Sequence, residues 1–207
     1  MKKKLYQTKT LDEAKALAFQ DFGLKEPEII FKIIKERKGF LGIGRHLEVE
    51  AVVNVDGIKK GKEYIQMILE SNHVNGLIEK KARGNNVLYN IEAGDFNGYL
   101  IGKNARNLAS LQTLVAIVVN NYYAPNETKK VTVDVGGYRK RRERNLERMA
   151  IQYGKQVART KQKIKLDHLN AYERKIIHKK LANWKDVKTY SVGDEPYRNL
   201  VIEPKNK

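Results

Sequence analysis

The 207-residue sequence contains no cysteine, so neither disulfide bonds nor thiolate-ligated metal sites can form. Long apolar runs are missing as well. The longest, such as Leu114–Val119, fall far short of the roughly 20 residues that span a bilayer. No apolar segment of signal-peptide length follows the basic N-terminus. We therefore expect a cytoplasmic protein without membrane insertion.

Residue patterns of common catalytic sites are also missing. No Gly-x-x-x-x-Gly-Lys-Ser/Thr segment occurs, so Lys103 is not a P-loop lysine. The 4 histidines are dispersed, and there is neither a His-Glu-x-x-His motif nor a carboxylate cluster to hold metal ions. Because no nucleophile, base and orienting group can be assembled, we predict a protein that is not an enzyme and needs no metal or cofactor.

Acidic residues are too few to balance the basic ones. The chain carries 41 Lys/Arg against 24 Asp/Glu, a formal charge of +17. Residues 137–207 alone hold 20 Lys/Arg against 8 Asp/Glu, which is +12, whereas residues 1–53 and 54–136 contribute +3 and +2. A basic excess confined to one region indicates a polyanionic partner, with nucleic acid favoured over an anionic membrane surface.

Hydrophobic periodicity predicts an α+β chain of three small modules. Residues 1–53 are expected to fold as β-α-β-β, with Thr10 and Glu13 capping the helix. Residues 54–61 contain two glycines and predict a linker. Residues 62–136 predict the order α-β-β-α-α-β.

The last module, residues 137–207, is expected to be a basic α/β domain. It opens with a predicted helix from about residue 138 to 159 whose first turns are rich in arginine: Arg139, Arg141 and Arg142. Asn170 and Glu173 form a second capping-box pattern, before a helix that runs through about Leu181.

A glycine turn in the middle module is the first candidate site. The residues Gly102, Lys103 and Asn104 lie between two predicted helices, the second of which is strongly apolar. Backbone N–H groups at the positive end of a helix favour phosphate, and Arg106 adds charge there.

A second glycine-containing stretch, residues 38–44, lies in the first module. Its spacing invites a dinucleotide-loop interpretation, but a strand follows it where that fold needs a helix. We instead expect a loop that exposes Phe40 and Leu41 to a partner.

The third candidate site is the pair Arg174 and His178. Four residues apart on a predicted helix, they lie on one face, where the arginine offers a planar fork of donors and the histidine a neighbouring donor.

Two segments resemble known nucleic-acid-binding domains. Residues 62–136 are similar to a type II K-homology (KH) domain, because Ile101-Gly102-Lys103-Asn104-Ala105 lies where that family has a Gly-x-x-Gly loop that clamps about four nucleotides. The sequence departs at the second glycine, which is Ala105. Residues 169–178 and 189–198 resemble the single-stranded nucleic-acid-binding domain named for its Arg-x-x-x-His spacing. That resemblance implies contacts from Arg174, His178 and Arg198.

The three modules in this order, with Gly-Phe-Leu-Gly-Ile-Gly in the first, resemble the Jag (SpoIIIJ-associated) family of bacterial RNA-binding proteins over essentially the full length. The resemblance implies a cytoplasmic post-transcriptional regulator that binds single-stranded RNA, pairs with a small KH-domain protein, and affects cell elongation, division or sporulation. A homodimer is left open. Two alternatives stand beside it: single-stranded DNA as the ligand, and an adaptor that docks a protein or a membrane surface through the first module.

Overall fold

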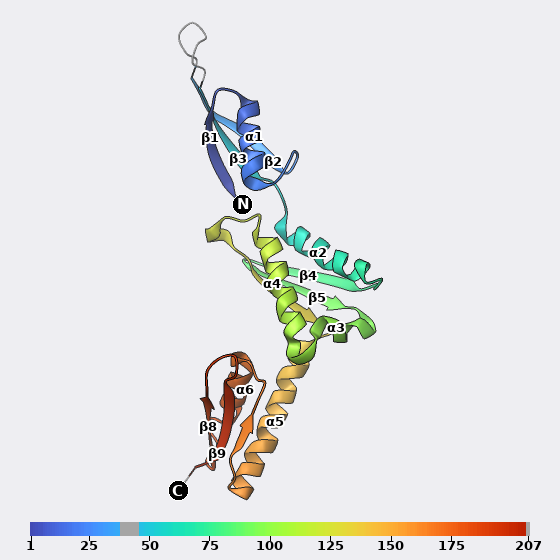
Figure 1. Ribbon diagram of the computed structural model, residues 1–207, viewed down its shortest axis with the longest axis vertical. Coiled ribbons are helices and arrows are strands. Elements are labelled where there is room, and N and C mark those ends of the chain that lie inside the picture. Colours follow the sequence, from blue (N-terminus) through green and yellow to red (C-terminus); the bar gives the residue numbers. More distant parts are fainter. Residues whose placement is uncertain (38–45, 206–207) are drawn as a thin grey trace. The chain divides into compact units, whose positions relative to one another are not determined.

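The computed structural model describes residues 1–37 and 46–205, and over these residues the protein is α+β with three 3-stranded sheets (Figure 1). Phe40 and Leu41, the predicted partner-binding residues, lie outside this part. The chain divides into two compact units, Met1–Gly136 and Gly137–Lys207, which are described separately. Among the described helices, none is long and apolar enough to cross a membrane.

The first three strands form an antiparallel sheet with the predicted β-α-β-β order. Its elements are β1 (Lys3–Thr8), α1 (Leu11–Phe22), β2 (Ile29–Arg37) and β3 (His46–Val53), with β3 in the centre of the order β1-β3-β2. Thr10 Oγ1 accepts a hydrogen bond of 3.2 Å from the backbone N–H of Glu13, so the predicted cap is present. Alternate residues of β3 are buried beneath α1, which gives this strand its two-residue period.

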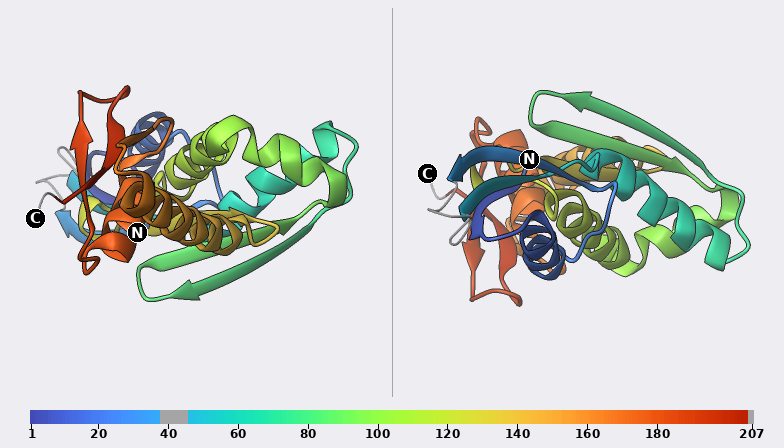
Figure 2. Two further views of the ribbon diagram at one scale, coloured as in Figure 1. Left: turned by 90° about the horizontal axis from the view of Figure 1, so that it is seen from below. Right: turned by 90° about the horizontal axis from the view of Figure 1, so that it is seen from above.

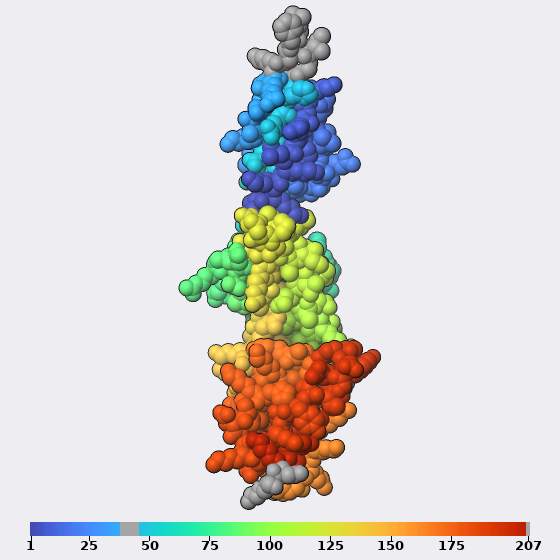
Figure 3. Space-filling model, turned by 90° about the vertical axis from the view of Figure 1, so that its left-hand side faces the viewer, coloured from blue at the N-terminus to red at the C-terminus, as the bar shows by residue number. Residues whose placement is uncertain are grey.

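The second sheet completes the first unit. Its elements are α2 (Gly57–Ser71), β4 (Leu77–Arg83), β5 (Asn86–Glu92), α3 (Asn97–Ile101), α4 (Arg106–Asn120) and β6 (Lys130–Val135). The strand order is β4-β5-β6, with β5 antiparallel to β4 and parallel to β6. Both α2 and α4 cover the same face of this sheet (Figure 2), and the β4–β5 hairpin (green) projects from the surface (Figure 3). The predicted α-β-β-α-α-β order is observed.

The predicted linker over residues 54–61 is wrong from Gly57 onward, because α2 begins there. Asp56 caps this helix by accepting hydrogen bonds from the N–H groups of Ile58 (2.9 Å) and Lys59 (3.1 Å). Gly57 is buried against α4, and a Cβ on it would lie only 2.4 Å from the carbonyl oxygen of Val119. The glycine is therefore a point of close helix packing and not a chain breaker.

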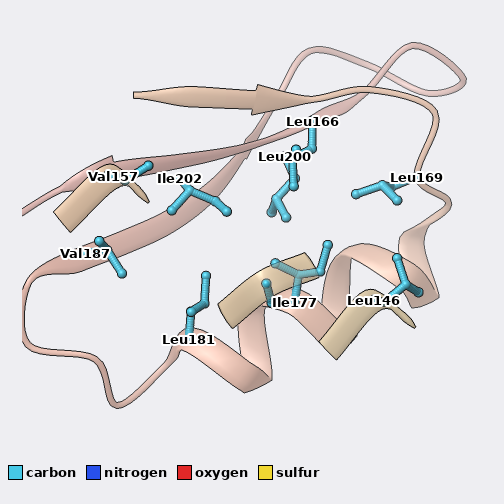
Figure 4. Close-up of a cluster of buried hydrophobic side chains, with 10 residues drawn as sticks. Leu146, Val157, Leu166, Leu169, Ile177, Leu181, Val187, Leu200 and Ile202 are labelled. Carbon is cyan, nitrogen blue, oxygen red and sulfur yellow. The ribbon is translucent and has the colours of Figure 1, made fainter. Parts of the chain in front are cut away.

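The second unit packs two helices against the third sheet. Its elements are α5 (Tyr138–Thr160), β7 (Ile164–Leu166), α6 (Ala171–Leu181), β8 (Val187–Val192) and β9 (Asn199–Pro204), with the antiparallel strand order β7-β9-β8. Aliphatic side chains from both helices and all three strands meet in one core (Figure 4): Leu146, Val157, Leu166, Leu169, Ile177, Leu181, Val187, Leu200 and Ile202. Burial of this apolar surface stabilises a small unit with a high positive charge.

Candidate nucleic-acid interface

The glycine turn at residues 102–105 connects α3 to α4. Gly102 has φ 67° and ψ 176°, and the side chain of Asn107 occupies the space where a Cβ on Gly102 would lie. Asn107 Nδ2 also donates a hydrogen bond of 2.7 Å to the carbonyl oxygen of Tyr99. The first turn of α4 is therefore bound directly to α3, and the glycine is needed for this close approach.

The next residues of the turn have an unusual backbone. Asn104 (φ 53°) and Ala105 (φ 57°) both lie in the left-handed region. Asparagine tolerates this conformation, whereas an alanine there is destabilised by about 1 kcal/mol relative to glycine. The structure thus keeps the conformation that a Gly-x-x-Gly loop adopts easily, although Ala105 replaces the second glycine.

Lys103 and Arg106 place two exposed cations on this turn. The first turn of α4 contains no acidic residue. Among the described residues, the ion pairs and side-chain hydrogen bonds involve neither of the two cations. Cations at the positive end of a helix dipole are electrostatically unfavourable, so an anion bound at this position would be stabilised by both the helix and the side chains.

Arg174 is buried, with only 5% of its surface exposed, and its guanidinium makes three polar contacts inside the second unit. Its Nη1 donates hydrogen bonds to the carbonyl oxygens of Leu169 (2.7 Å) and Arg198 (3.3 Å). Its Nη2 forms an ion pair with the carboxylate of Glu195. The sequence predicted this arginine as a direct phosphate contact. In the structure it holds the segment between β8 and β9 against the start of α6.

His178 lies half-buried one turn further along α6. Its ring nitrogens face two hydroxyl groups on β8, with Nδ1 2.7 Å from Thr189 Oγ1 and Nε2 3.3 Å from Ser191 Oγ. Burial, and secondarily the charge of Arg174, lower the pKa of His178 below its ordinary value of 6.5. The ring is therefore neutral at pH 7, with one N–H donor and one acceptor for the two hydroxyls.

The arginine-rich start of α5 contains one arginine that contacts α6 and two that are exposed. Arg142 Nε donates a 2.6 Å hydrogen bond to Glu173, whose carboxylate also caps α6 by accepting from the N–H of Asn170 at 3.1 Å. Arg142 is thus a link between the two helices. Arg139 and Arg141 are exposed, in a first turn that contains no acidic residue. Arg139 and Arg141 lie in the first turn of α5, where they add positive charge.

The predicted residues fall into two groups, one in each unit. Gly102, Lys103, Asn104 and Arg106 come together on the glycine turn. Arg174 and His178 share a face of α6 as predicted, and Arg198 is exposed on the segment that Arg174 holds. Sequence reasoning missed Thr189, Ser191 and Glu195. Thr189 and Ser191 lie two residues apart on a strand, so their side chains lie on the same face of the sheet. This spacing was the sequence signal that could have identified them.

Two family models match parts of this chain. The family model described as "Jag N-terminus" matches residues 6–55, and the model of the R-3-H domain, whose name abbreviates Arg-x-x-x-His, matches residues 144–204. The chain is 36% identical over 202 residues to RNA-binding protein KhpB of Bacillus subtilis, covering 95% of this chain and 96% of that protein. It is 33% identical over 203 residues to RNA-binding protein KhpB of Clostridium symbiosum, covering 96% and 90%. Because both matches run through nearly the whole of each chain, this protein belongs to the Jag/KhpB family.

Proposed function

We propose that this protein binds single-stranded RNA at two places, the glycine turn of the first unit and the basic surface of the second. The observation that carries the proposal is the pair of exposed cations, Lys103 and Arg106, at the positive end of α4 without an acidic partner among the described residues. The relatives, which are named RNA-binding proteins, support RNA as the polyanion.

Residues 62–136, together with the first turn of α2 from Gly57, act in this proposal as a type II KH domain. The order α-β-β-α-α-β, the mixed sheet and the position of the glycine turn between two helices support that assignment. The RNA backbone would lie along the turn, where N–H groups and the side chains of Lys103 and Arg106 meet its phosphates. The methyl group of Ala105 would weaken this grip relative to a glycine.

In the second unit, the exposed cations would contact phosphates and the buried groups would position them. Arg198 carries its side chain in solvent while Arg174 holds its backbone. Arg139 and Arg141 extend the positive surface along α5. His178 is neutral at pH 7, so it would contribute hydrogen bonds and ring contact and not charge. Two weak sites on one chain raise the overall affinity by increasing the effective concentration at the second site.

The finer role follows from the family resemblance. In this role the protein is a cytoplasmic post-transcriptional regulator that pairs with a small KH-domain protein and acts in cell elongation, division or sporulation. One observation favours adaptor activity in addition. The sheet face opposite α1 exposes Leu5 on β1 and Ile30 on β2, on either side of β3. Glu50 and Val52 of β3 lie opposite Leu5 and Ile30, so this face combines exposed apolar side chains with the Lys3–Glu50 ion pair (3.1 Å), and such a face suits a protein contact.

The test is fluorescence anisotropy with a labelled 12-nucleotide single-stranded RNA. We expect Lys103→Ala/Arg106→Ala to weaken binding clearly, and Arg198→Ala to weaken it to a smaller extent. The matched control is Lys9→Ala/Lys25→Ala, which removes two exposed cations from the first sheet domain and should leave the affinity unchanged. Unlabelled DNA and duplex RNA serve as competitors. If Lys103→Ala/Arg106→Ala bound RNA as tightly as the control variant, the glycine turn would be refuted as a site. If unlabelled DNA competed more strongly than unlabelled RNA, RNA would be refuted as the ligand.

A further inference from the structure

Two aromatic side chains stack beside the glycine turn. The rings of Phe96 and Tyr99 lie 5.4 Å apart, centroid to centroid, with 25° between their planes. Phe96 is half-buried, whereas Tyr99 is 73% exposed. Another aromatic pair, Phe19 and Phe31, meets edge to face and packs instead against the buried core under α1. The pair at the turn thus presents an aromatic side chain to solvent with a second ring behind it.

Backbone hydrogen bonds hold Tyr99 next to the turn. The N–H of Gly102 donates to the carbonyl oxygen of Gly98 at 2.9 Å, so Tyr99 and Gly102 belong to one helical turn. Residues three apart on a helix are neighbours, about 5–6 Å from each other. The hydrogen bond from Asn107 to the Tyr99 carbonyl, at 2.7 Å, secures the same residue from the opposite side of the turn.

Hydrogen bonds also hold the start of α3, and they fix the backbone next to Phe96. Asn97 Oδ1 accepts a hydrogen bond of 2.9 Å from the N–H of Ala93, and its Nδ2 donates one of 2.7 Å to Glu92. A ring that is already held in place loses little conformational entropy when a ligand stacks on it.

The charges around α3 give a bound strand a direction. Glu92 and the exposed Asp95 precede the helix, and Lys103 and Arg106 follow it. Phosphates would be attracted to the basic end and repelled from the acidic end. A nucleotide whose phosphate lies on the turn therefore has its base, the uncharged part, free to meet the aromatic pair.

We propose that Tyr99, supported by Phe96, is a stacking platform for one nucleobase of RNA held on the turn of residues 102–106. This inference rests on the proposed RNA binding and adds the residue that contacts a base. Stacking on an aromatic ring is tolerant of base identity, because every base has a π-face. The platform therefore selects for unpaired nucleotides and against duplex RNA, whose bases are already stacked.

The experiment compares Tyr99→Ala, Tyr99→Phe and Ile117→Ala by anisotropy with a 12-nucleotide oligouridine. Ile117 is the matched control, since it is 63% exposed and lies about 16 Å along α4 from Arg106. We expect Tyr99→Ala to bind about 5- to 100-fold more weakly, with Tyr99→Phe and the control close to wild type. The salt dependence of Tyr99→Ala should match that of wild type, because no phosphate contact is lost.

A 12-nucleotide abasic RNA backbone provides the second readout. Wild type and Tyr99→Ala should bind it equally, because no base remains to stack. If wild type binds oligouridine and Tyr99→Ala binds it equally well, the platform is refuted while RNA binding stands. Binding by Tyr99→Phe as weak as that of Tyr99→Ala would also refute it, because the hydroxyl would then be the contact. Absence of RNA binding by wild type would overturn both proposals, and circular dichroism verifies the fold of each variant.

Discussion

Arg174 Nη1 lies 2.7 Å from the carbonyl oxygen of Leu169 and 3.3 Å from that of Arg198, which places one buried guanidinium between the start of α6 and the segment before β9. The guanidinium of the Arg-x-x-x-His arginine thus holds the backbone of Arg198 in place. In the proposed function Arg174 is a positioning residue, and the direct contacts to RNA are proposed for exposed side chains.

Replacing Arg174 should destabilise the second unit. In Arg174→Ala the carbonyl oxygens of Leu169 and Arg198 lose their donor, and we expect the free energy of unfolding to fall by about 2–4 kcal/mol. Trp184 is the only tryptophan of the chain and packs against the core of this unit, so its fluorescence reports the unfolding in denaturant. Arg198→Ala is the control and should change the stability by less than about 0.5 kcal/mol. An Arg174→Ala variant with wild-type stability and lost RNA binding would instead make Arg174 a direct contact.

Stability of the second unit should depend on His178 at mildly acidic pH. Since the pKa of His178 is lowered in the folded unit, the unfolded chain binds a proton as the pH falls through 6.5 while the folded unit does not. The stabilisation is therefore complete above pH 6.5 and decreases as the pH falls towards the lowered pKa. We expect the Trp184 unfolding midpoint of wild type to fall more between pH 7.5 and pH 5.5 than that of His178→Gln. Identical shifts in the two proteins would contradict this account.

Gly57 should be required for the packing of α2 on α4. A glycine-to-alanine change inside a helix ordinarily stabilises it by up to about 1 kcal/mol, but the Cβ of Gly57→Ala would lie 2.4 Å from the Val119 carbonyl oxygen. We expect a loss of about 1–3 kcal/mol, as for other overpacked sites. Gly98→Ala is the control, because a Cβ there would have no neighbour within 4 Å, and it should stabilise the protein slightly. Thermal unfolding followed by circular dichroism distinguishes the two, and a stabilising Gly57→Ala would be inconsistent with the packing described.

Ala105→Gly should raise both the free energy of unfolding and the affinity of the glycine turn for RNA. Removing the side chain relieves the left-handed conformation at φ 57°, which raises the free energy of unfolding by up to about 1 kcal/mol. It also removes a methyl group from the surface proposed to meet phosphate, so the RNA affinity should rise. Ala109→Gly, an exposed position within α4, is the matched control and should lower the stability by about 1 kcal/mol without raising the affinity. Weaker RNA binding by Ala105→Gly would argue against a phosphate at the turn.

Local sequence signals predicted much of this fold. The capping box at Asn170 and Glu173 forms as expected, since both partners lie within four residues of each other. The α-β-β-α-α-β order also follows from hydrophobic periodicity within each element. In contrast, the start of α2 was missed, because a buried glycine that permits close helix packing looks the same in sequence as a glycine in a linker.

The roles of the arginines could not be predicted, because their partners are distant in the sequence. Arg142 pairs with Glu173, 31 residues away, and Arg174 donates to a carbonyl group 24 residues away. Glu173 is one of several acidic residues that could pair with Arg142, and the partner of Arg174 is a backbone carbonyl, which every residue has. An arginine that binds phosphate and one that holds a loop are therefore indistinguishable until the chain is folded.

The central claim, binding of single-stranded RNA through exposed cations in both units, is tested most directly by a salt titration. The affinity of wild type for a 12-nucleotide RNA would be measured by anisotropy between 50 and 300 mM salt. Each neutralised phosphate of a single strand contributes a slope of about −0.7 in log affinity against log salt. Contacts from Lys103, Arg106 and Arg198 alone predict a slope of about −2, with single-stranded RNA preferred over duplex RNA. A slope near zero, or no binding at the lowest salt, would contradict the account.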